Sequence, residues 1–231
     1  MGILMIKILN GIHETVAYDA FHGLKLYHNR EAENYPIHWH TALEIIMPVQ
    51  NEYTVIIDGT PHTFGEGDIF ITPPGTLHEL TAPPSGERLI LLFDYSTICN
   101  VKDMDSMLHT LLPYTLITRE EYPELNKKLQ FYLNEVVREY DHPMPFTEAC
   151  VYSLMIRFFV TLGRTNFNAN TKFPGITNHK QHEYVEKLTT QDLALLFEEI
   201  SKEDMIRVFR LLPKDEAADV FSYMEPDLQE E

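Results

Sequence analysis

The sequence predicts a mainly β fold followed by helices, and three observations lead to this fold class. Residues 21–95 contain short apolar stretches separated by Gly and Pro turns, which is typical of a β-sandwich or barrel. Within them, residues 53–57 are followed by Asp58-Gly59 and a return strand over 60–64, the pattern of a β-hairpin. After residue 120, apolar residues recur at helical spacing instead.

Two further strands and two long helices are expected in the same part of the chain. Residues 68–72 and 88–95 are apolar and bounded by turn residues, which favours buried strands. The spacing predicts an amphipathic helix over 121–140 and a more apolar helix over 146–163. Gly163 is expected to cap the second helix at its C-terminus.

The composition is that of an ordinary globular protein. Of the 231 residues, 44% are hydrophobic and 23% are charged, so disorder is not expected. The formal charge of −17 argues against a nucleic-acid surface, because neutralising phosphates requires clustered Lys and Arg. Residues 1–9 are too short for a signal peptide, and no run reaches the roughly 18 apolar residues of a membrane span. Two cysteines without C-x-x-C spacing fit a reducing compartment, so we expect a cytoplasmic protein without a membrane span.

Four polar side chains of the β region form the most specific pattern in the sequence. On a strand, His38 and His40 point to the same side, and Glu44 has the same parity. His78 follows much later, after a Pro-Pro-Gly turn. Three imidazoles and a carboxylate that converge on one point suit a divalent transition metal, with Zn, Ni, Fe and Mn all chemically possible. The same residues can instead hydrogen-bond an organic ligand, and the sequence leaves both interpretations open.

These residues resemble the two sequence motifs of the cupin family. H-x-H-x3-E begins at His38, and G-x5-P-x-G-x2-H ends at His78, in the order that the family has them. Asn51 replaces the motif glycine after the glutamate, and Ala82 replaces the polar residue that ends the second motif. Both departures lie outside the ligand positions. The resemblance implies a cupin double-stranded β-helix, or jelly-roll, barrel whose pocket contains His38, His40, Glu44 and His78.

A wider resemblance covers residues 13 to about 187. H-W-H-x3-E-I-I, a D-G hairpin, G-D-I-F-I-T-P-P-G-T-L-H and two long helices are similar to the sensor half of AraC-family transcription regulators. The resemblance implies that the barrel binds a small effector, in that family often a sugar, and that the helices form a homodimer. On this basis we expect an N-terminal arm (1–20), a cupin barrel (21–98), a helical dimerisation region (99–164), a linker (165–187) and an acidic helical segment (188–231).

The acidic helical segment does not fit the DNA-binding half of that family. Residues 188–231 hold 4 Lys or Arg and 12 Asp or Glu, a net charge of −8, whereas a recognition helix needs basic residues. The segment resembles part of the helical N domain of MgtE-type magnesium transporters, in which acidic residues of the cytosolic region bind Mg²⁺. Mg²⁺ binding and a merely solvated helical hairpin both stay open for it. We expect no direct, specific nucleic-acid binding by this chain.

Two functions are therefore expected. The first is that of an effector-sensing cupin domain of an AraC-type transcription regulator that lacks a complete DNA-binding domain. In such a sensor, the N-terminal arm would close over the ligand and the packing of the two helices would change, because the ligand shifts the equilibrium between two conformations of the protein. The second is that of a metal-dependent cupin enzyme, either a dioxygenase or an isomerase. Because the sequence supplies no separate general base, it favours the sensor over the enzyme.

Overall fold

The structure is a computed structural model that describes residues 9–10, 12–18, 23–102, 104–168 and 219–222. The chain divides into two compact units, residues 1–176 and 177–231. In the second unit, the described residues 219–222 are helical. The rest of the predicted acidic helical segment, like most of the predicted linker, lies outside the described residues.

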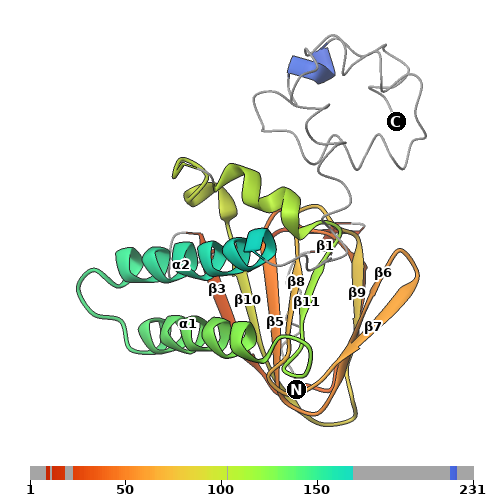
Figure 1. Cartoon of the computed structure of the whole chain (residues 1–231). Coiled ribbons are helices and arrows are strands. Elements are labelled where there is room, and N and C mark those ends of the chain that lie inside the picture. Colours follow the sequence, from red (N-terminus) through yellow and green to blue (C-terminus); the bar gives the residue numbers. More distant parts are fainter. Residues whose placement is uncertain (1–8, 11, 19–22, 103, 169–218, 223–231) are drawn as a thin grey trace. The chain divides into compact units, whose positions relative to one another are not determined.

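The first unit has a β part followed by two long helices, as predicted (Figure 1). Its strands are β1 (Leu9–Asn10), β2 (His13–Glu14), β3 (Leu24–Asn29), β4 (Tyr35–His38), β5 (Leu43–Gln50), β6 (Tyr53–Ile57), β7 (Thr60–Phe64), β8 (Ile69–Thr72), β9 (His78–Thr81), β10 (Glu87–Phe93) and β11 (Thr115–Ile117). The short 3₁₀ helices η1 (Tyr95–Thr97) and η2 (Asp105–Leu111) precede the long helices α1 (Pro123–Asp141) and α2 (Thr147–Asn168).

Two antiparallel sheets form the β part. One has the strand order β11-β8-β5-β10-β3, and the other has the order β4-β9-β6-β7. The β6–β7 hairpin pairs over its whole length and turns at Asp58 and Gly59, which both have positive φ, as the Asp-Gly pair predicts. Chain neighbours β7 and β8 lie in different sheets, so the chain winds between the two sheets as it does in a jelly roll. The predicted fold class is confirmed.

The five-stranded sheet separates two hydrophobic clusters. An inner cluster lies between the two sheets and includes Ile46, Phe70 and Ile90. An outer cluster joins the other face of the same sheet to α1 and α2, and it includes Ile45 and Leu129. Because strand residues alternate between faces, neighbours such as Ile45 and Ile46 belong to different clusters.

Helix α1 is attached to the sheet by side-chain amides as well as by apolar contacts. Asn126, which is buried, donates to the carbonyl oxygens of Gly67 (2.9 Å) and Ile117 (3.0 Å). Gln130, one turn later, donates to the same Gly67 oxygen at 2.8 Å. These bonds satisfy backbone carbonyls of the turn before β8 and of β11, and they fix the helix over the sheet.

The structure differs from the sequence prediction at three places. Strand β11 was not predicted. It pairs with β8 as the edge strand of the five-stranded sheet, and it lies in the region expected to be helical. Helix α2 continues to Asn168, past the predicted start of the linker at 165. Gly163 was predicted to end that helix, and this is wrong: it lies buried inside α2, where a Cβ would meet the Met107 sulfur at 3.0 Å. Close packing, and not a helix end, accounts for this glycine.

Candidate metal and ligand site

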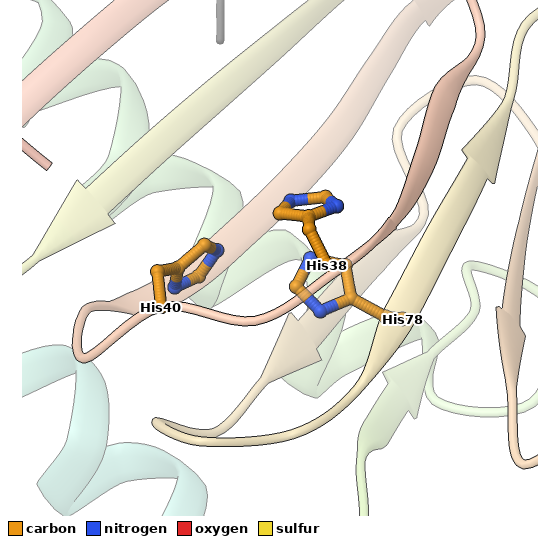
Figure 2. Close-up of side chains that lie close together, drawn as sticks. All are labelled: His38, His40 and His78. Carbon is orange, nitrogen blue, oxygen red and sulfur yellow. The ribbon is translucent and has the colours of Figure 1, made fainter. Parts of the chain in front are cut away.

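The four residues predicted from the sequence lie together at one end of the barrel interior. His38 ends β4 and stands opposite His78, the first residue of β9. His40 follows β4, and Glu44 lies on β5. All four are nearly inaccessible to solvent, with exposed fractions of 1–6%. One nitrogen from each imidazole lies within 4.8 Å of the others, and Figure 2 shows the three rings turned toward one another.

Backbone carbonyls fix the orientation of all three imidazoles. The Nδ1 atoms bond to carbonyl oxygens two residues away: His38 to Pro36 (2.8 Å), His40 to Ala42 (3.0 Å) and His78 to Thr76 (2.9 Å). A carbonyl can only accept, so each Nδ1 carries the proton, and in the neutral ring each Nε2 presents a lone pair. This is the arrangement that histidine ligands of metals typically have.

A turn joins the two motif segments. The Gly75 amide donates to the carbonyl of His40 at 2.9 Å, and Gly75 has a φ of +76°. The positive φ at this position favours glycine. Thr76 then supplies the oxygen that holds His78. The Pro-Pro-Gly segment therefore sets the position of His78 relative to His40.

Glu44 and His78 form a close buried pair. The Glu44 Oε2 and His78 Nε2 atoms are 3.1 Å apart, but without the alignment of a hydrogen bond. Burial alone would raise the pKa of Glu44, yet the contact with His78 and the neighbouring imidazoles lower it below its usual range. Burial would likewise lower the pKa of His78, but the contact with Glu44 raises it. In His40, burial lowers the pKa to about 4, so this ring is neutral near pH 7.

The residues present fit a divalent metal ion. Among the described residues, the buried atoms without a hydrogen-bond partner include His40 Nε2, His78 Nε2 and Glu44 Oε2. Buried polar atoms are normally paired, and three unpaired atoms facing one space suit a cation that accepts their lone pairs, which for His78 requires the neutral ring. The donor set of imidazole nitrogen and carboxylate oxygen is compatible with Zn, Ni, Fe and Mn.

Two further pocket residues were not found from the sequence. Glu14, on β2, is buried, and its carboxylate lies 3.5 Å from His38 Nε2. Burial, reinforced by the charge of Glu44, raises the pKa of Glu14 to about 7, although His78 and Lys25 oppose this. Residues 13–16 are His-Glu-Thr-Val, and this short, mostly polar stretch has no pattern that would indicate a pocket.

Thr72 is the second residue that the sequence analysis missed. It stands opposite Glu44 in the β5–β8 pairing, so the two side chains leave the same face of the sheet. Its side chain is fully buried, and no residue of the described part of the chain hydrogen-bonds its hydroxyl. Its place directly before the Pro-Pro-Gly turn was available in the sequence but has no chemical signature of its own.

Two aromatic residues near the motifs lie outside the pocket. Trp39 is half-buried and its ring contacts that of His13, with ring centroids 4.3 Å apart. His62, on β7, is half-buried against Tyr114 at a centroid distance of 4.1 Å. Neither belongs to the histidine cluster.

In the described part of the chain, no helix combines the length and hydrophobicity that crossing a membrane requires.

Comparison with known proteins agrees with this architecture. Residues 29–93 match the cupin domain family, and residues 188–231 match the MgtE intracellular N domain. No curated protein matches the chain.

Similar solved structures include an RmlC-like cupin from Shewanella frigidimarina (23% identity, TM-score 0.30), with 32% of this chain and 68% of that chain covered. A protein from Neisseria meningitidis is 19% identical, with 31% and 75% covered and a TM-score of 0.29. A mutant oxalate decarboxylase from Bacillus subtilis is 25% identical, with a TM-score of 0.28. That match spans 31% of this chain and 21% of the decarboxylase. By its domain match and its two-sheet topology, the chain contains a cupin domain within residues 29–93.

Proposed function

We propose that the chain is a sensor with the layout of AraC-type regulators, in which the cupin pocket holds a divalent transition metal and, beside it, a small-molecule effector. The observation that carries this proposal is the fixed orientation of three buried imidazoles, whose Nδ1 atoms are all engaged by backbone carbonyls. A metal bound there would supply a positively charged centre for polar atoms of the effector.

The sensor role is supported by the position of the helices. α1 and α2 pack on the sheet whose other face contributes Glu44 and Thr72 to the pocket. On the outer side of α1, Phe131 is 58% exposed, which suits a helix that packs against a second copy of the chain. We propose that two copies of the chain form a homodimer through α1 and α2, and that effector binding changes the packing of these helices. The acidic composition agrees with a chain that does not itself bind DNA specifically.

Metal analysis tests the proposal directly. Chelator-treated protein is incubated with Zn, Ni, Fe(II) or Mn, desalted, and measured by elemental analysis. We expect about one ion per chain for at least one metal, and a loss of binding in His78→Asn. The matched control is His62→Asn, because His62 lies outside the histidine cluster. Absence of stoichiometric metal under all four conditions would refute the metal part of the proposal, and calorimetric titrations with sugars and small metabolites would then test the effector part alone.

A metal-dependent enzyme is the second candidate, and Glu14 is the observation that favours it. The sequence offered no separate general base, but the structure places a buried carboxylate with a pKa of about 7 beside His38. A group with a pKa near neutrality is well suited to accept and return a proton. Oxygen-uptake and sugar-isomerisation assays on metal-loaded protein test this candidate. Turnover that Glu14→Gln abolishes would favour the enzyme, and lack of turnover would leave the sensor.

A further inference from the structure

A short N-terminal strand brings Glu14 to the pocket. β2 lies beside Trp39, the residue between the first two histidines: the Glu14 amide donates to the Trp39 carbonyl, and the Trp39 amide donates to the Ile12 carbonyl, both at 2.9 Å. The His13 and Trp39 rings also contact each other. Glu14 is therefore held by backbone bonds on the segment that carries the histidines, with its carboxylate turned inward to His38.

Apart from the Thr72 hydroxyl, which can also donate, the polar atoms that face this space are mainly hydrogen-bond acceptors. His40 Nε2 is a buried acceptor without a partner, the Glu44 carboxylate lies 3.1 Å from His78 Nε2, and the carboxylate of Glu14 adds another acceptor group. Lys25 is near enough for its charge to lower the pKa of Glu14. Its ammonium group, however, donates to the Ala17 carbonyl at 2.8 Å, in exposed surroundings. Solvent screens such a cation, so it offsets the pocket carboxylates only in part.

Charge balance then decides which ligands the site accepts. Three neutral imidazoles and one carboxylate would leave a divalent ion with an excess positive charge, which attracts anions. A second carboxylate at Glu14 removes that excess when it is ionised. In a site this buried, the charge of one carboxylate acts with little screening on anything that binds beside it.

We propose that Glu14 is a specificity-determining residue of the pocket: its carboxylate excludes anionic ligands from the metal centre and favours uncharged ligands that donate hydrogen bonds through hydroxyl groups. This inference rests on the proposed metal site and names the ligand class that the site would take. It requires Glu14 to contact the ligand, and it does not require Glu14 to bind the metal.

Azide binding to the cobalt-loaded protein tests the inference. Co²⁺ is used as the metal because its visible absorption changes when an anion joins its coordination sphere, and azide is the anionic probe. At pH 8.5, above the Glu14 pKa of about 7, we expect Glu14→Gln to bind azide roughly tenfold or more tightly than the wild type, since one buried negative charge is removed at nearly constant shape. Glu14→Asp, which keeps the charge, should remain close to the wild type.

The matched control is Glu120→Gln, which removes a carboxylate of the same kind from an exposed position. It should leave the azide affinity unchanged, and circular dichroism confirms that each variant is folded. Equal azide affinities of Glu14→Gln and the wild type, both loaded with Co²⁺, would overturn this inference and leave the metal site standing. Failure of the wild type to bind Co²⁺ would overturn the metal site together with the inference.

Discussion

Replacing Thr72 by Val gives a sharp test of the pocket geometry. The Thr72 side chain is fully buried, and within the described part of the chain its hydroxyl has no hydrogen-bond partner. An unpaired buried polar group costs about 1–3 kcal/mol, and Val has nearly the same volume without the hydroxyl. In metal-free protein, Thr72→Val should therefore increase the free energy of unfolding by about 1–3 kcal/mol. At roughly 2–4 °C per kcal/mol for a unit of this size, Tm should rise by about 2–12 °C.

Thr115 provides the opposite case within the same sheet. It is equally buried, but its hydroxyl donates to the Leu111 carbonyl at 3.3 Å. Thr115→Val should lower the free energy of unfolding by about 0.5–1.5 kcal/mol, because one hydrogen bond is lost. Urea and thermal denaturation of the two variants are compared under identical conditions. If Thr72→Val destabilises the protein as Thr115→Val does, the Thr72 hydroxyl is not an unpaired group that faces the pocket, and the geometry described for it is wrong.

Three further outcomes are expected. The pKa of Glu14 is raised from 4.5 to about 7, so the native protein binds more protons than the unfolded chain between these values, and the stability that Glu14 contributes is lost as pH rises through 7. Glu14→Gln removes this dependence. In urea titrations of metal-free protein, the free energy of unfolding of the variant should therefore increase by about 2–3 kcal/mol relative to that of the wild type between pH 4.5 and 8. Leu129→Ala, at a fully buried position of α1, should cost about 2–5 kcal/mol by the same assay. Phe131→Glu should keep the fold but convert the proposed dimer to a monomer in sedimentation experiments, and a wild type that is already monomeric would refute the dimer.

Most of the fold could be predicted because local signals agree with the tertiary structure. The Asp58-Gly59 turn and the alternation over β6 specify a hairpin whatever surrounds it. The convergence of the histidines was predicted, but strand parity is not the reason for it. β4 ends at His38, His40 follows the strand, and Glu44 lies on β5 of the other sheet. Strand β11 was missed because three residues carry too little periodicity, and it exists only because β8 offers a free edge.

The residues missed in the pocket depend on long-range contacts that leave no local trace. Glu14 lies 24 residues before His38 in the sequence, and it reaches the pocket only because β2 pairs with the backbone of Trp39. Thr72 can be recognised as a pocket residue only from its pairing with Glu44 on the neighbouring strand. Gly163 was taken for a helix end because a glycine in a helix is usually unfavourable, whereas here it leaves room for the Met107 side chain.

The sheet beneath the pocket has a mechanical consequence. Glu44 faces the pocket, and Ile45, the next residue, is fully buried against the helical layer. Their Cα atoms are held about 3.8 Å apart by one peptide unit, and a closely packed interior has few voids that could absorb a shift. A ligand that displaces the backbone at Glu44 by a fraction of an ångström must therefore displace Ile45 as well. The peptide unit between Glu44 and Ile45 joins the pocket to the helical layer, so the helices can respond to ligand binding without a hinge.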